Sequence, residues 1–339
     1  MSKKGVLLVN LGTPDSAATP DVRKYLNEFL MDGRVIDINV VSRALLVRGI
    51  IVPFRAPKSA KLYREIWSKE TGSPLLHYSL MQQKLLQQKL GDEYMVELAM
   101  RYQSPSIEKA LERLKQALVS EIRVIALFPQ YASASTGSVY QKVMKLVGEW
   151  PTIPNISFVN SFHDNDLMIT AFAENAKKHQ PEKYDHILFS FHGLPQRQLM
   201  TCDHTHNHCL KSTDCCQTLT DVNKFCYSAQ SHDTARLIAA KMGLSKDQYT
   251  VCFQSRLGND PWVQPYTSQV IAELAAQGKK SLLVFCPAFV ADCLETVYEV
   301  SVEYQEEFKE KGGDKVQLVE SLNDNPLFIE ALEGLVKGR

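Results

Sequence analysis

The sequence has no excess of either charge, no basic stretch and no long apolar run, and each absence excludes a class of protein. Its 339 residues carry 38 Lys+Arg against 38 Asp+Glu, so the formal net charge is zero and nothing indicates a nucleic-acid partner. No apolar run reaches the ~18 residues that a membrane-spanning helix needs. The first residues enter a strand-like run directly, without the apolar core and cleavage site of a signal peptide. We therefore expect a cytoplasmic protein.

Hydrophobic residues make up 45% of the chain and charged residues 22%, which is typical of a globular protein. The length suits about two domains of ordinary size. Cysteine is not scarce: five of the eight cysteines lie between residues 202 and 226. In a reducing compartment such clustering indicates a metal site more than disulfides.

Matching segments predict a chain built from two similar halves. GVLLVNLGTP (5–14) and HILFSFHGLP (186–195) are both strands that run into a turn with Gly and Pro at the same offsets. RVIALFPQYASASTG (123–137) and SLLVFCPAFVADCLE (281–295) form a second matching pair. Apolar runs without alternation indicate strands buried on both faces, hence parallel sheets covered by helices. The expected fold class is α/β, with two Rossmann-like halves.

Further elements complete each half. Strands are expected over 94–102 and 249–257, and helices over 107–119 and 267–277. Two prolines break the pattern within 150–155, so the expected domains are 1–155 and 156–339. The alternative is one long doubly wound sheet. The last helix of the chain is expected to pack back on the first half.

An acidic row follows the strand over 281–286. Glu295, Glu299 and Glu303 recur every four residues on the helix that is expected there, which places them along one face. The row begins near the carboxyl end of a strand, where α/β sheets bind ligands. Carboxylates in line suit the passage of protons or of a hard cation. The alternative is a solvated acidic face, although the apolar residues in the same segment predict that much of it is buried.

His192 ends the strand that opens the second half, at the position that Leu11 occupies in the first half. Its ordinary pKa of about 6.5 suits proton uptake, and neutral imidazole also binds metals. The alternative is a purely structural histidine. Because Glu295 also follows a strand end of the same half, we expect the two side chains to face one crevice, where they could accept protons, hold a divalent ion, or both.

Five motifs in order resemble the ferrochelatase family, which inserts Fe²⁺ into a porphyrin: LLVNLGTP, FPQYASASTGS, SFHGLP, FQSRLGNDPWVQPYT and PAFVADCLETVYE. The similarity spans roughly residues 4–330. It implies two Rossmann-like halves with a porphyrin cleft between them, and it places the catalytic pair of the family on His192 and Glu295. In the family the acidic row lies on a partly π-helical segment, and π-bulges often mark functional sites.

The resemblance implies Fe²⁺ and protoporphyrin IX as substrates and the release of two protons. His192 is expected to accept a proton, and Glu295, with Glu299 and Glu303, to pass metal or protons; which does which stays open. Apolar walls for the porphyrin and polar partners for its propionates are expected from two further groups: Leu11, Tyr63, Tyr131 and Trp262 for the walls, and Ser73, Arg101 and Ser133 for the propionates.

The sequence departs from the family pattern at two positions. Cys293 stands where the family often has His, two residues before Glu295. Leu11 stands where the coproporphyrin-metallating branch has Tyr, which favours protoporphyrin IX as the substrate. The alternatives are a chelatase for coproporphyrin or another tetrapyrrole, and a non-catalytic haem or porphyrin carrier.

Residues 200–230 form a segment that the core fold does not need. Its cysteine spacing, C-x6-C-x5-C-C-x9-C, differs from the short pairs of zinc fingers. Thiolates in such number suit a [2Fe–2S] cluster, which some ferrochelatases carry, while zinc and reduced thiols without metal are the alternatives. The expected cluster ligands are Cys202, Cys209, Cys215 and Cys216, with Cys226 in reserve. The same segment holds three histidines: His204, His206 and His208.

Residues 28–54 are rich in large apolar side chains interrupted by Arg34, Arg43 and Arg48. The segment is too charged to span a bilayer. The family places such a segment as a lip over the cleft, and an apolar lip beside cations suits shallow membrane contact. The alternative is a lip packed wholly on its own domain. The sequence predicts no oligomeric state.

Overall fold

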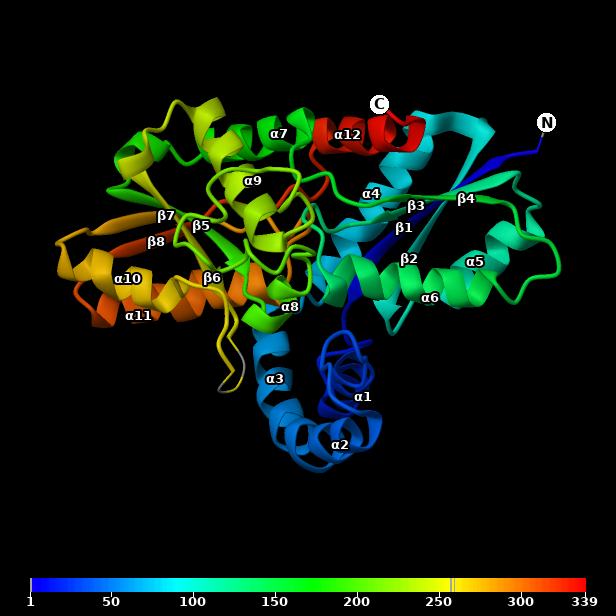
Figure 1. The fold of residues 1–339 in the computed structure, drawn as a ribbon, viewed down its shortest axis with the longest axis horizontal. Coiled ribbons are helices and arrows are strands. Elements are labelled where there is room, and N and C mark those ends of the chain that lie inside the picture. Colours follow the sequence, from blue (N-terminus) through cyan, green and yellow to red (C-terminus); the bar gives the residue numbers. More distant parts are fainter. Residues whose placement is uncertain (1, 257, 259) are drawn as a thin grey trace. The chain divides into compact units, whose positions relative to one another are not determined.

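The computed structural model describes residues 2–256, 258 and 260–339, and the chain forms two compact units, each around one sheet (Figure 1). All pairings in both sheets are parallel, and the strand orders, β2-β1-β3-β4 and β6-β5-β7-β8, are the same arrangement repeated. The prediction of two similar Rossmann-like halves is therefore confirmed. The strands are β1 (Lys4–Gly12), β2 (Tyr94–Tyr102), β3 (Glu121–Ala126) and β4 (Asn155–Val159), then β5 (His186–His192), β6 (Tyr249–Gln254), β7 (Ser281–Phe285) and β8 (Lys315–Leu318).

The strands form where uninterrupted apolar runs can be buried on both faces. In β1, Val6, Leu7, Leu8 and Val9 are all fully buried, so side chains on both sides of the sheet are covered. The expected strand over 94–102 coincides with β2, whereas the one expected over 249–257 ends at Gln254. Leu257, the last residue of that expectation, lies outside the described residues.

Helices cover the first sheet, and one of its faces packs against α5 and α6. Leu7 and Val9 of β1 share a core cluster with Leu111 of α5 and Val143 of α6. The helical segments of this unit are α1 (Thr19–Leu30), α2 (Val40–Ala44), η1 (Leu45–Ile51), α3 (Val52–Ile66), α4 (Pro74–Leu90), η2 (Gly91–Glu93), α5 (Ile107–Gln116), η3 (Ser133–Gly137) and α6 (Ser138–Val147).

The second sheet packs against α10, η6 and α11 in the same way. Leu188 of β5 and Val284 of β7 join Ile271 of α10, Val300 of η6 and Phe308 of α11 in one core cluster. The helical segments of this unit are α7 (Asp166–Lys177), η4 (Pro181–Lys183), α8 (Gln196–Met200), α9 (Tyr227–Met242), η5 (Lys246–Gln248), α10 (Thr267–Ala276), η6 (Leu294–Tyr304) and α11 (Gln305–Glu310), followed by α12 (Pro326–Lys337), which both units share.

The boundaries of the two units are set by strand pairing and not by the two prolines within 150–155. β4 pairs with β3, so the first unit continues to Asn160, beyond the change of half expected at 155. Pro129–Tyr131 belong to the second unit although they follow β3. Leu332–Arg339 belong to the first unit, where Arg123 donates to the Leu335 carbonyl at 3.2 Å.

The matching turns after β1 and β5 both require glycine. Gly12 has φ +119°, and a Cβ there would lie 2.1 Å from the Tyr102 carbonyl oxygen. A Cβ on Gly193 would lie 2.9 Å from the Gln254 carbonyl oxygen. In each half the glycine therefore lets the turn lie against the neighbouring strand end.

Both halves carry a π-helical segment after corresponding strands. η3 follows β3 and leads into α6, and η6 follows β7 and leads into α11. η6 runs over 11 residues, which is long for a π-helix, and it contains the whole acidic row. The π-helical conformation that the resemblance implied for this segment is therefore present.

Candidate functional site

His192 lies at the carboxyl end of β5 with its ring between two aromatic residues. The ring centroid is 6.5 Å from that of Trp262 and 6.4 Å from that of Phe289. The Nδ1 atom lies 2.7 Å from the Gly193 carbonyl oxygen. Because a carbonyl oxygen can only accept, Nδ1 is the donor in this contact, and Nε2 is the ring nitrogen that remains available. The half-buried ring is thus oriented to accept a proton or bind a cation through Nε2.

Gln254 connects the His192 strand end to the acidic row. It lies opposite His192 in the β5–β6 ladder, and its side-chain amide donates to the Glu295 carbonyl at 2.8 Å and to Glu299 Oε2 at 3.1 Å. Its Oε1 accepts from the Ser190 hydroxyl at 2.7 Å. This buried amide therefore holds the start of η6 against the end of β5.

Glu299, the middle carboxylate of the row, is fixed in place. Besides the Gln254 amide, it accepts from the Ser255 backbone N–H at 3.1 Å, the Ser255 hydroxyl at 2.7 Å and the Tyr304 hydroxyl at 2.8 Å. Ser255 adopts φ 65°, a strained conformation for a residue with a Cβ, and this aims its amide at the carboxylate. Four donors thus occupy Glu299.

The other two carboxylates of the row are in different surroundings. Glu295 is half-buried, and Glu303 is exposed at the far end of η6. Partial burial and, after it, the Glu299 charge raise the pKa of Glu303. A raised pKa brings the carboxylate closer to exchanging protons with water near neutral pH. Burial also raises the pKa of Cys293, so that this residue is a neutral thiol beside Glu295.

Trp262 packs against the Gly193 turn. It forms an isolated bridge with Pro195. A Cβ on Gly193 would lie only 3.1 Å from the Trp262 ring. The indole is 9% exposed, and its Nε1 finds no acceptor among the residues that the structure describes. A buried donor without a partner is costly, and it is available for a ligand.

In the first unit, Arg101 is held by Asp32, a residue that the sequence did not single out. The Arg101 Nη2 lies 2.6 Å from Asp32 Oδ2, and its Nε donates to the Ser138 hydroxyl at 2.7 Å. Asp32 also accepts from the Tyr102 hydroxyl at 2.9 Å. This ion pair orients the guanidinium, which therefore has a fixed direction.

The other predicted substrate residues of this unit lie in distinct settings. Ser73 is buried at the start of α4 and its hydroxyl accepts from Thr13, in the turn that follows Leu11. Ser133 opens η3 and accepts from Arg34 Nη1 at 2.7 Å. Tyr63 is buried edge-on to Tyr25. The half-buried Leu11 lies beside Gly12 at the end of β1.

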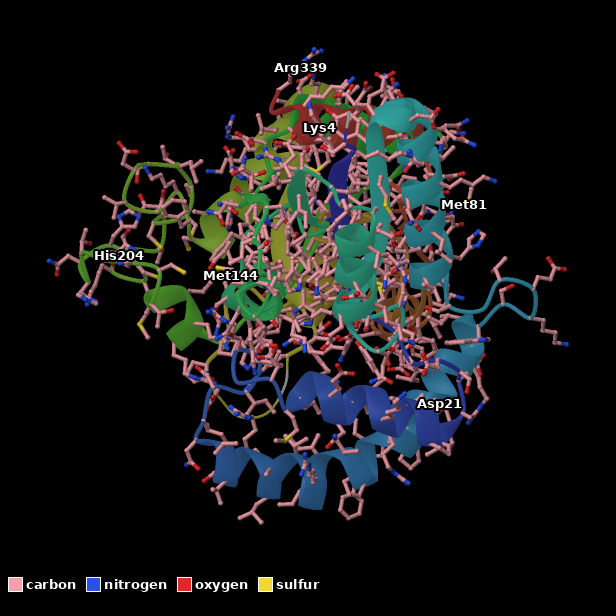
Figure 2. All side chains as sticks on the ribbon, turned by 90° about the vertical axis from the view of Figure 1, so that its right-hand side faces the viewer. Lys4, Asp21, Met81, Met144, His204 and Arg339 are labelled. Carbon is pink, nitrogen blue, oxygen red and sulfur yellow. The ribbon has the colours of Figure 1, made fainter. Side chains whose placement is uncertain are left out.

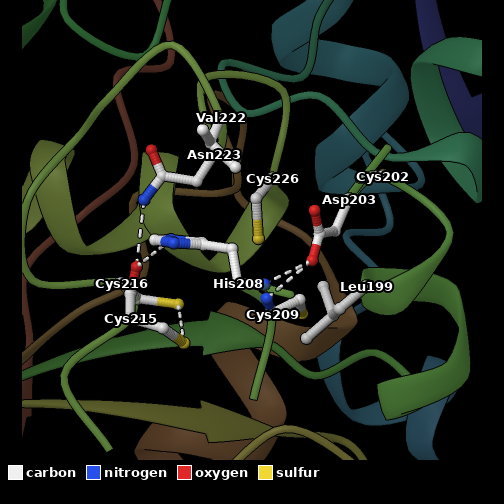
Figure 3. A pocket seen from close by; sticks show the side chains of 10 residues that line it. All are labelled: Leu199, Cys202, Asp203, His208, Cys209, Cys215, Cys216, Val222, Asn223 and Cys226. Carbon is white, nitrogen blue, oxygen red and sulfur yellow. Dashed lines mark hydrogen bonds between the residues drawn. The ribbon is translucent and has the colours of Figure 1, made fainter. Parts of the chain in front are cut away.

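The cysteine segment encloses a small pocket in the second unit, shown in Figure 3. All five of its cysteines line the pocket, together with Leu199, Asp203, His208, Val222 and Asn223. The sulfurs of Cys215 and Cys216 are 3.6 Å apart. The structure therefore brings together the four predicted ligands and the reserve cysteine.

The surroundings of Cys226 favour its thiolate form. The Cys209 and Cys216 side chains, and after them the Ala229 and Ser228 amides at the start of α9, lower the pKa of Cys226 against the effect of burial. The same interaction raises the pKa of Cys209 and, together with burial, that of Cys216. Five cysteine sulfurs around one small pocket suit a cation that prefers soft ligands.

Two polar side chains shape the loop around this pocket. Asp203 accepts from the backbone N–H groups of His208 and Cys209, both at 2.9 Å. These bonds and, first of all, the Thr205 hydroxyl lower the Asp203 pKa. Asn223 donates to the Cys215 carbonyl at 3.0 Å, and His208 Nε2 lies 3.0 Å from the same oxygen. His204 projects outward from the segment (Figure 2).

The side chains that line the pocket are not arranged as a metal site. Within residues 2–256, 258 and 260–339, no group of three or more His, Cys, Asp or Glu side chains is arranged to hold a metal ion as it stands. The donor chemistry fits a thiophilic metal or an iron–sulfur cluster, but binding would require the sulfurs to move.

Several residues of the site carry no local signal in the sequence. Gln254, Ser255, Tyr304 and Asp32 are ordinary polar residues until the sheet brings them to their partners. A polar residue at the end of an apolar strand was the one available hint for Gln254.

Comparisons with known proteins agree with the geometry. The ferrochelatase family model matches residues 3–339. The chain is 42% identical to a ferrochelatase of Legionella pneumophila, over 98% of each protein. It is also 42% identical to a ferrochelatase of Coxiella burnetii, over 99% of this chain and 94% of that protein.

Solved structures share the fold at low sequence identity. The structure of SirB from Bacillus subtilis with Fe³⁺ is 12% identical, has a TM-score of 0.54, and the match covers 99% of this chain and 94% of SirB. A sirohydrochlorin chelatase SirB from Bacillus subtilis subspecies spizizenii in complex with cobalt is 11% identical, with a TM-score of 0.51 over 99% and 94% of the two chains. These similarities support the fold alone.

Proposed function

The chain belongs to the ferrochelatase family, and from that premise we propose that it inserts Fe²⁺ into protoporphyrin IX to give protohaem. The reaction forms iron–nitrogen bonds and releases the two pyrrole N–H protons of the free-base porphyrin. The observation that carries the proposal is the connection of His192, through Gln254, to the acidic row on η6.

We assign the uptake of a pyrrole proton to His192. Its Nδ1 lies against the Gly193 carbonyl oxygen, which leaves Nε2 as the ring nitrogen that can accept a proton. The Trp262 and Phe289 rings beside it provide an apolar surface on which a flat macrocycle can lie. Proton acceptance by a positioned histidine is ordinary general-base chemistry.

We assign the passage of metal or protons to Glu295, Glu299 and Glu303. The exposed Glu303 is suited to exchange with solvent, while Glu299 is held by four donors and keeps the row in line. Glu295, half-buried at the start of η6, would be nearest the reacting centre. Hard carboxylate oxygens hold Fe²⁺ weakly enough to release it to pyrrole nitrogens.

The roles of the remaining predicted residues follow from their chemistry. Leu11, Tyr63, Tyr131 and Trp262 would contact the porphyrin plane. Hydroxyl and guanidinium groups would bind its propionates, and the Asp32 pair supports a fixed direction for such a guanidinium. The residues of this second set are Ser73, Arg101 and Ser133.

Anaerobic metallation by the purified chain tests the function. Fe²⁺ and protoporphyrin IX should be consumed with loss of porphyrin fluorescence, and coproporphyrin III, run in parallel, should react more slowly. Glu295→Gln protein is the negative control. Binding of porphyrin without turnover under either condition would make the protein a tetrapyrrole carrier, and faster turnover of coproporphyrin would change the substrate.

We further propose that the cysteine pocket binds a [2Fe–2S] cluster. The effect of Cys209 and Cys216 on the pKa of Cys226, within one pocket, supports these three residues as ligands, and Cys202 and Cys215 are the candidates for the fourth. This revises the predicted set, in which Cys226 was the reserve. Such a cluster, when bound, supplies one-electron redox chemistry. Single Ser variants at the five cysteines, scored by iron content, identify the fourth ligand.

We also propose that the lip touches a membrane surface. Five large apolar side chains of α2, η1 and α3 are at least 59% exposed, at Val40, Val41, Leu45, Ile50 and Phe54. The exposed cations Arg55 and Lys58 lie on the same helical stretch. No helix among the described residues is long and apolar enough to cross a membrane. Shallow insertion beside anionic headgroups suits this combination.

A further inference from the structure

The loop that carries Tyr131 is held by helix α9 of the second unit. The Tyr131 backbone N–H donates to Gln230 Oε1 at 2.7 Å. One residue earlier, the Gln130 amide donates to the Thr234 hydroxyl at 3.0 Å. Gln230 and Thr234 lie one turn apart on α9, and both are at most 1% exposed. The position of Tyr131 therefore depends on this helix.

The same Gln230 side chain holds the end of the cysteine segment. Its Nε2 donates to the Lys224 carbonyl at 2.7 Å, two residues before Cys226. Its backbone N–H donates to the Cys226 carbonyl at 3.0 Å. One buried amide thus accepts from the Tyr131 loop through its oxygen and donates to the cysteine segment through its nitrogen.

A buried amide with both ends bonded cannot shift at one end without cost at the other. A displaced partner leaves a donor or acceptor unpaired in a dry site. Cys226 lies between Lys224 and the first turn of α9, so a restraint on the Cys226 sulfur acts on the short piece of backbone that carries the Lys224 carbonyl. Gln230 then carries that constraint to the Tyr131 amide.

We propose that Gln230 is a positioning residue that couples the occupancy of the cysteine pocket to Tyr131 and thereby to porphyrin binding. The inference rests on the proposed function through the placement of Tyr131 against the porphyrin. Coupling between two sites is reciprocal at equilibrium, so porphyrin should also raise the affinity of the pocket for metal by the same factor.

Hydrogen exchange at the Tyr131 amide is the direct test, because its bond to Gln230 is the link itself. Protein reconstituted anaerobically with Fe³⁺ and sulfide should protect this amide more than chelator-treated protein. Cys226→Ser should remove protection whether or not metal is taken up. Gln230→Met, similar in size but without amide hydrogen bonds, should expose the amide equally in all states. Equal exchange in wild type, Cys226→Ser and Gln230→Met would overturn the proposal.

Porphyrin affinity separates coupling from a merely structural role. Cys226→Ser and Gln230→Met should each lower the affinity for porphyrin about fivefold or more, with little change in kcat. The double variant should bind porphyrin as tightly as the single variant that has the lower affinity. Ser231→Ala is the matched control, because this buried neighbour on α9 donates to the Tyr227 carbonyl of its own helix. Its effect should be small and additive with that of Cys226→Ser. Additive effects of Cys226→Ser and Gln230→Met would contradict the proposal.

The two proposals fail in different ways. If the protein does not metallate porphyrin but exchange of the Tyr131 amide still responds to the cysteine pocket, the assigned function is wrong. The coupling between the cysteine pocket and the loop then remains. Normal metallation with no response of the Tyr131 amide would leave the function and remove the coupling.

Discussion

The Tyr304 hydroxyl donates to Glu299 Oε1 at 2.8 Å, from a ring that is packed in the core of the second unit. The two residues are five positions apart within the same π-helix. Burial, and then the Glu299 charge, raise the pKa of this hydroxyl, so it is a permanent donor at physiological pH. The middle of the acidic row is therefore anchored to the core.

Tyr304→Phe tests that anchor. The substitution keeps the ring and removes one hydrogen bond to a carboxylate, an interaction of about 1.5–3 kcal/mol. We expect the metallation rate to fall on the order of tenfold and the melting temperature to fall by a few degrees, about as much as the loss of one such bond predicts. Tyr249→Phe is the control, because Tyr249 packs edge-on to Phe189 in the same unit, away from the row. Equal metallation rates for both variants would show that the hydrogen bond from Tyr304 to Glu299 does not contribute to the reaction.

His192→Ala and Glu295→Gln should each lower kcat for Fe²⁺ insertion by about 10²–10⁴-fold, the usual contribution of a positioned acid or base. Both side chains are half-buried and outside the main core, so circular dichroism should be unchanged. Porphyrin binding, measured by fluorescence quenching, should persist. Near-normal turnover in either variant would remove that residue from the chemistry.

Asp32→Asn should change the response of the protein to acid. Burial alone would raise the Asp32 pKa, but hydrogen bonds from Ser138 and the Arg34 amide, together with the Arg101 charge, lower it below 3.8. A carboxyl whose pKa is lower in the folded state adds stability above pH 3.8, and this stability is lost as the pH falls through the folded value. The variant should lose about 3 kcal/mol at neutral pH and show a flatter stability curve below pH 4.

Urea unfolding between pH 3 and 7 measures this effect. Asp92→Asn, an exposed carboxylate of the same unit, is the control and should follow the wild-type curve. A wild-type slope below pH 4 that persists in Asp32→Asn would assign the acid sensitivity to other carboxylates.

Cys226→Ser should abolish metal retention by the cysteine pocket, because it removes one of the proposed sulfur ligands from the pocket lining. Iron content and charge-transfer absorption after anaerobic reconstitution are the measurements. His204→Ala, at an exposed histidine of the same segment, should retain full iron. Loss of iron in the histidine variant, with retention in the cysteine variant, would reverse the assignment of ligands.

Phe54→Ser should weaken binding to anionic vesicles on the order of tenfold, since the side chain is 73% exposed and its burial in lipid is worth about 2 kcal/mol. Cosedimentation with vesicles of mixed phosphatidylcholine and phosphatidylglycerol is the measurement. Leu118→Ser removes an equally exposed apolar side chain, 79% exposed, outside the lip. It should bind as wild type, and parallel losses in both variants would indicate nonspecific adsorption.

The sequence by itself determined the repeated α/β plan and the placement of the acidic row on one helical segment. Local features can be predicted from sequence because burial and backbone conformation depend on a few neighbouring residues. Such features here are the uninterrupted apolar strands, the turns at Gly12 and Gly193, and the four-residue spacing of Glu295, Glu299 and Glu303. The strand over 94–102 was predicted to the residue for this reason.

Only the tertiary structure decided which side chains support the site. Asp32 meets Ser138 across 106 positions, Gln230 meets Tyr131 across 99, and Gln254 meets Glu299 across 45. Such pairs depend on strand order and on which helix covers which sheet edge, and polar residues carry no periodic signal of their partners. The proposal that Cys226 is a ligand has the same origin: the start of α9 supplies backbone amides that no cysteine spacing reveals.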